Sequence, residues 1–246
     1  MLQKPNDKAA ELTKQTAGLS TIEILQRLAS DYPGAVTFST SFSNEDQIIT
    51  YLIAQSRSDI SLFTLDTGRL FQTTYNVWQD TLAALNVSIK GYYPDTESIH
   101  NFTLEHGPNA FYQSVDLRKQ CCHIRKVVPL KKALKNKSVW ITGLRTEHST
   151  SRSELNQFEW DEENNLVKFH PLLHWRTNEI TAFLKQYNLP YNPLTEKGFV
   201  SIGCEPCTRA ILPGEDFRAG RWWWEEANKK ECGLHVHPIT REEINQ

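Results

Sequence analysis

The sequence has few of the features that mark secreted, membrane-spanning or nucleic-acid-binding proteins. Its first 18 residues contain no apolar stretch of the kind found in secretory signals. Its longest near-continuous apolar run, residues 48–54, is far shorter than the roughly 18 residues that suggest a membrane span. The net charge of −2 gives no reason to expect nucleic-acid binding. We therefore expect a cytoplasmic protein that binds neither membranes nor nucleic acid.

Internal repeats and low-complexity segments are also absent from the sequence. The chain has 246 residues, of which 39% are hydrophobic and 23% charged, as in an ordinary globular protein. That length is enough for one large domain or two small ones. We expect a flexible, frayed N-terminus over residues 1–19, an α/β domain over residues 20–200 and a C-terminal segment over residues 201–246.

Short apolar runs alternate with helical patterns over the first part of the chain. Ser20 and Glu23 form a capping box that opens the first expected helix. Expected strands cover residues 35–39, 60–65, 87–93 and 138–142. Strands that alternate with helices imply a mostly parallel sheet with helices on both faces. Residues 158–170 are expected to form a hairpin or an excursion from the sheet, and the chain beyond Pro190 has little periodicity.

Three polar turns follow three of the expected strands: SFSNED over residues 41–46, LDTG over residues 65–68, and GLR over residues 143–145. In an open α/β sheet, ligands bind at the carboxyl ends of the strands. Each turn alone has an ordinary explanation: helix capping by Ser43 or Asn44, a simple turn, or a solvated loop. Together at one end of a sheet, they favour a binding site for a nucleotide-type anion.

Five cysteines remain to be explained, and in a reducing compartment they are more often ligands or catalysts than disulfides. Cys121 and Cys122 are adjacent in a helical pattern, and Cys204 and Cys207 form a C-x-x-C pair. If the helix is locally distorted, these four could hold Zn²⁺ or an iron–sulfur cluster. The alternative is a set of buried apolar cysteines, and the spacing alone does not decide between the two.

Cys232 is left over, and lysines at positions 229 and 230 precede it. Nearby cations lower the pKa of a thiol and favour the nucleophilic thiolate. The alternative is an inert thiol near the end of the chain.

The motifs LDTG, CCHIRKVVPL, GCEPCTRA, GEDFRAGRWWWE and ECGLH occur in this order along most of the chain. In this combination, the chain resembles the assimilatory sulfonucleotide reductases, and among them the iron–sulfur type that reduces adenylylsulfate. The resemblance implies an adenine-nucleotide α-hydrolase-like fold, related to the ATP pyrophosphatases, and a [4Fe–4S] cluster.

The resemblance also assigns roles to individual residues. Cys121, Cys122, Cys204 and Cys207 match the cluster ligands, and Cys232 matches the catalytic cysteine, with His235 in support. The positions that match substrate contacts are Ser41, Phe42, Ser43, Asp46, Leu65, Asp66, Thr67, Gly68, Lys126, Gly143, Arg145, Arg152, Arg218 and Arg221. One departure concerns the first loop, where relatives usually carry glycine or another small residue. We expect Asn44 to take the unusual backbone conformation there.

The reaction implied by the resemblance is reduction of adenylylsulfate to sulfite and AMP through an S-sulfocysteine on Cys232. Thioredoxin, or a glutaredoxin-like donor, would supply the electrons, and the ECGLH segment would close over bound nucleotide and open for the donor. Three alternatives stay open: a 3′-phosphoadenylylsulfate reductase, a nucleotidyl transferase related to ATP pyrophosphatases, and a zinc-stabilised module without catalysis. Assembly into a homo-oligomer is left open as well.

Overall fold

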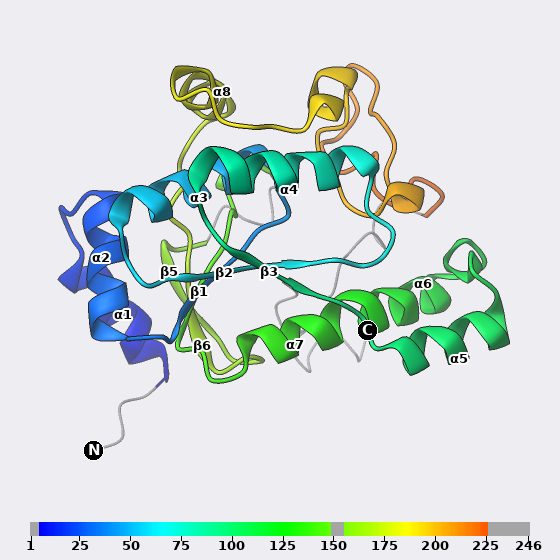
Figure 1. Cartoon of the computed structure of the whole chain (residues 1–246), viewed down its shortest axis with the longest axis horizontal. Helices are drawn as coiled ribbons and strands as arrows, with labels where there is room; N and C mark the ends of the chain where they lie inside the picture. Colours follow the sequence, from blue (N-terminus) through cyan, green and yellow to red (C-terminus); the bar gives the residue numbers. More distant parts are fainter. Residues whose placement is uncertain (1–4, 149–154, 226–246) are drawn as a thin grey trace, which may run out of the picture.

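The computed structural model describes residues 5–148 and 155–225 (Figure 1). Its centre is a six-stranded sheet in the order β3-β2-β1-β4-β6-β5. All neighbouring strands pair in parallel except β5, which is antiparallel to β6. The strand bounds are Val36–Ser39 (β1), Ser61–Leu65 (β2), Ile89–Tyr92 (β3), Val139–Ile141 (β4), Phe158–Asp161 (β5) and Leu166–Phe169 (β6). The predicted parallel sheet and the predicted hairpin are both confirmed.

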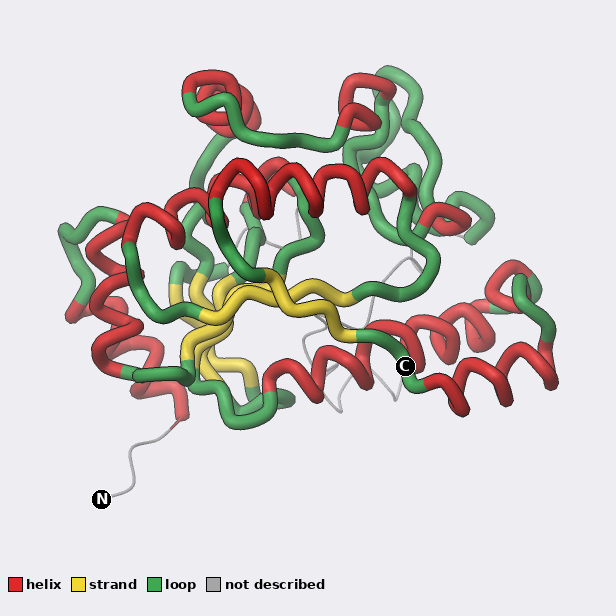
Figure 2. The backbone as a smooth tube through the Cα atoms, in the orientation of Figure 1, coloured by secondary structure: helices red, strands yellow, loops and turns green. Residues whose placement is uncertain are grey.

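Helices cover both faces of this sheet, as Figures 1 and 2 show. Helices α3 and α4 lie on one face, with α8 beyond them, and α7 lies on the other face with α6 and α5 extending from it. The helix bounds are Pro5–Gln15 (α1), Thr21–Asp31 (α2), Asn44–Ser56 (α3), Gln72–Leu85 (α4), Thr96–His106 (α5), Val115–Cys122 (α6), Val128–Leu134 (α7) and Thr177–Gln186 (α8). Among the described residues, no helix is long and apolar enough to cross a membrane.

The prediction of a frayed N-terminus is wrong for helix α1. Ala9 and Leu12 on this helix are 8% and 3% exposed and belong to the main hydrophobic core. Lys8 lies 5.6 Å from the ring centre of Trp160 on β5. The polar composition of this segment concealed two apolar contacts, spaced three residues apart, that are enough to hold a helix against the edge of the sheet.

The helical pattern predicted around Cys121 and Cys122 is interrupted in the structure by a π-helical turn, His123–Val127 (η2), directly after the two cysteines. Pro129 stands at the start of α7, where its missing N–H breaks the regular hydrogen-bond ladder. π-Turns inside helices occur frequently at functional sites. The local distortion that a shared metal centre would need at Cys121 and Cys122 is therefore present in the backbone.

Apart from the short helix Pro193–Lys197 (η5), the chain from residue 190 to 225 is largely irregular, as expected. A 3₁₀ turn, Glu205–Cys207 (η6), holds the C-x-x-C pair. Isolated bridges join Leu70 to Cys204 and Thr208 to Arg221. The first of these bridges joins the C-x-x-C pair to the segment that follows β2. Two segments that are far apart in sequence are therefore in contact.

Candidate active site

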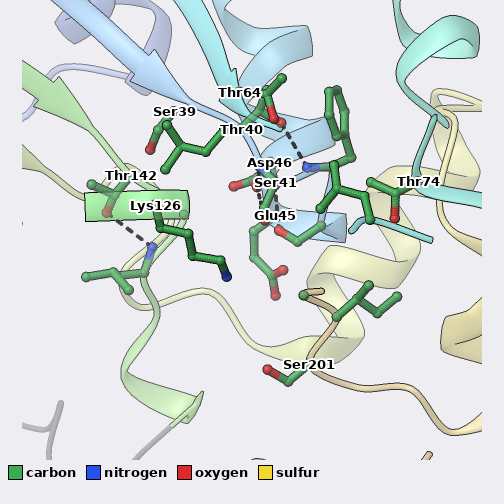
Figure 3. Close-up of a pocket in the computed structure, with 18 of the residues that line it drawn as sticks. Ser39, Thr40, Ser41, Glu45, Asp46, Thr64, Thr74, Lys126, Thr142 and Ser201 are labelled. Carbon is green, nitrogen blue, oxygen red and sulfur yellow. Dashed lines mark hydrogen bonds between the residues drawn. The ribbon is translucent and has the colours of Figure 1, made fainter. Parts of the chain in front are cut away.

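A cavity of about 310 Å³ opens at the carboxyl ends of β1, β2 and β4 (Figure 3). Thr40 follows β1, Thr64 lies near the end of β2, and Thr142 follows β4, and all three line it. The opposite wall comes from the C-terminal segment, including Ser201 and Gly203. Its volume lies at the lower end of the range for small-molecule sites, and its place is where open α/β sheets bind ligands.

The loop of residues 41–46 forms one side of this cavity and caps helix α3. The Asp46 N–H donates to Ser43 Oγ at 3.2 Å, so the capping interpretation of Ser43 is confirmed. The Ser41 N–H and Oγ–H donate to Asp46 Oδ2 at 2.6 and 2.8 Å. Burial raises the pKa of Asp46 to about 6, against the opposing effect of the Ser41 hydrogen bonds. Ser41, Ser43 and Asp46 all line the cavity.

The unusual backbone conformation in this loop belongs to Phe42, not to Asn44 as expected. Phe42 has φ of 62°, whereas Asn44 is the first residue of α3. A positive φ is costly for a bulky residue and needs compensation from its surroundings. Phe42 is 2% exposed and stacks on Trp78 of α4 with ring centroids 5.5 Å apart. Packing of the large ring therefore holds a turn that glycine would adopt without strain.

In the LDTG turn, residues 65–68, alternate members face different ways. Leu65 and Thr67 line the cavity. Asp66 does not line it; its Oδ1 accepts hydrogen bonds from the Gly68 N–H and the Tyr75 hydroxyl, both at 2.8 Å. Gly68 has φ of 69°, which the turn requires. The ordinary-turn explanation thus fits Asp66 and Gly68, and the predicted substrate contacts of this turn rest on Leu65 and Thr67.

Gly143 and Arg145 also separate into different positions. Gly143 lines the cavity, and a Cβ atom there would lie 2.4 Å from Asp46 Oδ1, so only glycine leaves room for that carboxylate. Arg145 is 2% exposed and does not line the cavity. Its guanidinium donates to Glu45 Oε1 at 2.8 Å and to Glu147 Oε2 at 2.6 Å. Arg145 therefore holds Glu45, a lining residue, instead of facing the cavity itself.

The four cysteines at positions 121, 122, 204 and 207 line one small cavity of about 20 Å³ beside the larger one. Cys121, Cys204 and Cys207 are buried, in a cluster with Phe111 and Trp222. No three of the described His, Cys, Asp and Glu side chains are arranged to hold a single metal ion. Four thiols around one cavity are a donor set of the kind that holds Zn²⁺ or an iron–sulfur cluster.

The thiols in this small cavity have unequal pKa values. Burial, together with the neighbouring thiols of Cys204 and Cys122, raises the pKa of Cys207 to about 12. Burial also raises the pKa of Cys204, but Lys126 and the Thr67 hydroxyl outweigh burial and bring it below its ordinary value. Thr67 Oγ1 lies 3.2 Å from Cys204 Sγ. The LDTG turn therefore contacts the cysteine cavity as well as the larger one.

Lys126 lines both cavities and forms part of the wall between them. Figure 3 shows its side chain extending toward the space occupied by Glu45. Arg218 and Arg221 line the larger cavity as predicted. Gly203 makes room for Arg221, because a Cβ atom there would lie 2.5 Å from the Arg221 Nη2. Lys126, Arg218 and Arg221 thus line a cavity that also borders the N-terminus of helix α3. Positive side chains together with a helix N-terminus favour the binding of an anion.

Several lining residues escaped sequence reasoning. They are Ser39, Thr40, Thr64, Leu70, Thr74, Leu130, Trp140, Thr142, Val200, Ser201, Ile202, Gly203, Phe217 and Trp222. The hydroxyl residues among them lie at or near strand ends, a signal that the sequence offers once the strands are located. The predicted residues Cys232, His235 and Arg152 lie outside the described part of the chain, as does the predicted closure of ECGLH.

Comparisons with known proteins agree with this arrangement. Residues 35–210 match the model of the phosphoadenosine phosphosulfate reductase domain. The chain is 43% identical to adenosine 5′-phosphosulfate reductase of Burkholderia cepacia, over 94% of this chain and 93% of that protein. It is 44% identical to the protein of the same name from Allochromatium vinosum, over 91% and 87%.

A solved structure of phosphoadenylyl-sulfate reductase from Candida auris, a phosphate complex, superposes with a TM-score of 0.70 at 25% identity, over 83% of this chain and 97% of that one. Yeast FAD synthetase in complex with FAD superposes with a TM-score of 0.51 at 18% identity, over 85% and 76%, which shows the fold alone. The expected adenine-nucleotide α-hydrolase-like fold is confirmed. By sequence and structure, the chain belongs to the phosphoadenosine phosphosulfate reductase domain family.

Proposed function

We propose that this protein is an enzyme that reduces adenosine 5′-phosphosulfate to sulfite and AMP. The observation that carries the proposal is the pair of adjoining cavities: one suits a nucleotide, the other is lined by four cysteines, and Lys126 borders both. Relatives at 43% and 44% identity over nine tenths of the chain are named adenosine 5′-phosphosulfate reductases, which supports the same substrate here.

The larger cavity provides what a phosphosulfate group needs. Lys126, Arg218 and Arg221 line it, and cations at fixed positions bind phosphate and sulfate oxygens strongly. Apolar lining residues such as Leu65, Leu144 and Val200 offer surfaces for an adenine ring. Arg145 contributes through Glu45, whose carboxylate it fixes, and not by direct contact with the anion.

In the proposed reaction, the Cys232 thiolate attacks the sulfur of the sulfate group. A sulfur–sulfur bond forms, the bond from sulfur to the bridging phosphate oxygen breaks, and AMP leaves with that oxygen and the electron pair. Lys126, Arg218 and Arg221 stabilise the negative charge that grows on the phosphate. One thiol of a dithiol protein, thioredoxin or a glutaredoxin-like donor, then attacks Cys232 Sγ, releases sulfite and forms a mixed disulfide with Cys232. The donor's second thiol breaks this bond and frees Cys232, so the donor leaves as a disulfide and has supplied both electrons.

The small cavity is proposed to hold a [4Fe–4S] cluster through Cys121, Cys122, Cys204 and Cys207. The π-turn at residues 123–127 and the Thr67 contact to Cys204 support this assignment. Bound there, the cluster would supply positive charge close to Lys126 and the substrate anion. Thiolates that must stay reduced also favour the cytoplasm as the proposed location.

The decisive experiment compares two cysteine variants with the wild-type protein. Cys232→Ser should form no detectable sulfite yet bind AMP within about twofold of the wild type, because it removes only the nucleophile. Cys122→Ser serves as the matched control: it should lose iron, measured with acid-labile sulfide, whereas Cys232→Ser retains it. Sulfite production by Cys232→Ser at the wild-type rate would refute the mechanism.

Substrate choice is tested by measuring kcat/KM for adenosine 5′-phosphosulfate and for its 3′-phosphorylated form with the same dithiol donor. We expect the unphosphorylated nucleotide to be preferred. A strong preference for the 3′-phosphorylated one would reassign the substrate within the family. Colourless protein that contains zinc and reduces neither nucleotide would instead favour a non-catalytic zinc module, and pyrophosphate release from ATP would favour a nucleotidyl transferase.

A further inference from the structure

A buried ion pair joins the cysteine-bearing helix α6 to the last described residue of the chain. Arg118 Nε donates to Glu225 Oε1 at 2.9 Å, and Arg118 Nη2 donates to Glu225 Oε2 at 2.7 Å. The two side chains are 1% and 3% exposed. The Arg118 guanidinium also lies over the ring of Trp222, 4.6 Å from its centre. A forked pair of this kind fixes orientation as well as distance.

The two ends of this pair have different neighbours. Arg118 stands one helical turn before Cys121 and lines the cysteine cavity. Glu225 precedes Cys232 by seven positions, and its N–H donates to the Trp222 carbonyl at 2.8 Å. The Trp222 N–H in turn donates to the Cys207 carbonyl at 3.2 Å. Residues 222–225 are therefore fastened to both cysteine pairs, through Arg118 on one side and Cys207 on the other.

We propose that Arg118 and Glu225 are positioning residues that set the point and direction from which the chain leads to Cys232. The proposal rests on the function proposed above, in which Cys232 attacks the substrate. Seven residues of chain reach at most about 25 Å. The position of Glu225 therefore bounds how far from it the thiol can lie, and a misplacement of a reacting group by about 1 Å can cost about 100-fold in rate.

The competing explanation is that the ion pair only stabilises the fold. Substitutions that remove the charges but keep the contact distinguish this role from positioning. Removing one member of a buried ion pair leaves the other charged and uncompensated, so single variants lose stability in either case. Replacing both members by apolar side chains of similar volume often restores stability. Arg118→Met with Glu225→Met keeps the contact buried but lacks the fork, so it separates stability from orientation.

The test measures three quantities in the double variant: thermal stability, the Kd for AMP, and the single-turnover rate at which adenosine 5′-phosphosulfate modifies Cys232, followed by mass spectrometry. We expect wild-type stability within a few degrees, an unchanged Kd within about twofold and a rate about 100-fold lower. The matched control is the Arg209–Glu215 pair, which is also forked at 2.8 Å but is about one third exposed. Its double Met variant should keep rate and Kd within about twofold.

A wild-type rate in a folded Arg118→Met/Glu225→Met variant would overturn the proposal. Equal losses in AMP affinity and rate would also overturn it, because the pair would then shape the nucleotide site. Arg118 lines the cysteine cavity, so iron per chain is measured throughout, and a rate loss that follows iron loss counts against the proposal. Glu225 does not line that cavity, so Glu225→Asp, which shortens one arm of the fork, should lower the rate without loss of iron.

Hydrogen exchange provides a readout that does not need the reaction. The Glu225 amide should exchange at least tenfold faster in Glu225→Asp than in the wild type, and it should be unaffected in the Arg209 control. If the wild type reduces no sulfonucleotide but this acceleration is seen, the proposed function is wrong, whereas the Arg118–Glu225 pair still fixes residue 225. If the wild type reduces the nucleotide and neither exchange nor rate responds, the positioning role fails alone.

Discussion

The two adjoining cavities of this molecule are built in different ways. The larger one is assembled from strand ends and the turns that follow them, so most of its polar residues lie close to a predicted strand. The smaller one joins Cys121 and Cys122 on helix α6 to Cys204 and Cys207 on an irregular segment some 80 residues later. The first is a property of the sheet, and the second depends on a contact between distant parts of the chain.

This difference shows in the charges of each cavity. The larger cavity combines a buried carboxyl group of raised pKa, Asp46, with the cations Lys126, Arg218 and Arg221. The smaller one surrounds its thiols with Arg118, Arg125 and Lys126. Lys126 lines both cavities, and the Thr67–Cys204 contact is one of those that join them. Substitutions at these connections and at Asp46 therefore test whether the cavities work together.

The largest effect is expected for Lys126→Met, which removes the cation from the shared wall. If Lys126 stabilises charge on the departing phosphate, kcat for sulfonucleotide reduction should fall about 100- to 1,000-fold. Lys131→Met is the matched control, because Lys131 on α7 is 53% exposed and pairs with Glu163 at the surface. It should keep kcat within about twofold. If Lys126→Met also keeps kcat within about twofold, Lys126 does not couple the two cavities in the reaction.

Asp46 makes the stability of the larger cavity depend on pH. Burial raises its pKa to about 6 from an ordinary value of 3.8, so the folded protein keeps a proton that the unfolded chain releases between about pH 4 and 6. As the pH rises from about 4 to 6, the contribution of Asp46 to the free energy of unfolding should therefore fall by roughly 2–3 kcal/mol. Asp46→Asn should lack that fall, and denaturation by urea from pH 4 to 7 measures the difference.

Asp161 on β5 provides a control of opposite sign. Burial raises its pKa, but Lys168 and Asn164 outweigh burial and lower it below its ordinary value. The stability contributed by Asp161 is therefore present at neutral pH and is lost as the pH falls toward its lowered pKa. Asp161→Asn should destabilise the protein at pH 7, whereas Asp46→Asn should not. If both variants destabilise the protein at pH 7, Asp46 is not a buried acid whose ionisation is unfavourable in the folded state.

Much of the larger cavity could be predicted because sheet architecture follows from local patterns. Alternating apolar runs gave the strands, and parallel strands bring their carboxyl ends to one edge, where Ser41, Thr67 and Gly143 now lie. Side-chain direction could not be predicted in the same way. Asp66 faces Tyr75, and Arg145 faces Glu45 and Glu147, because partners that only the folded chain supplies compete for each polar group.

The remaining errors arise where packing overrides local preference. Helix α1 forms because Ala9 and Leu12 reach the core, although the segment around them is polar. Phe42 takes the positive φ because Trp78 of α4 provides a surface for its ring, a contact between loop and helix that the loop sequence does not reveal. The cysteine cavity was suggested by residue type and by resemblance, and only the fold could bring its two halves together.

The smallest effect is expected for Thr67→Val, which removes the hydroxyl that contacts Cys204. Thr67 is 1% exposed, and its Oγ1 also accepts a hydrogen bond from the Arg69 N–H at 3.2 Å. Losing these contacts while keeping the shape should lower the free energy of unfolding by about 1 kcal/mol, measured by urea denaturation. Thr64→Val is the control, because Thr64 is 2% exposed and lines the larger cavity but not the smaller one. If both variants lose the same stability, the Thr67–Cys204 contact does not help to hold the two cavities together.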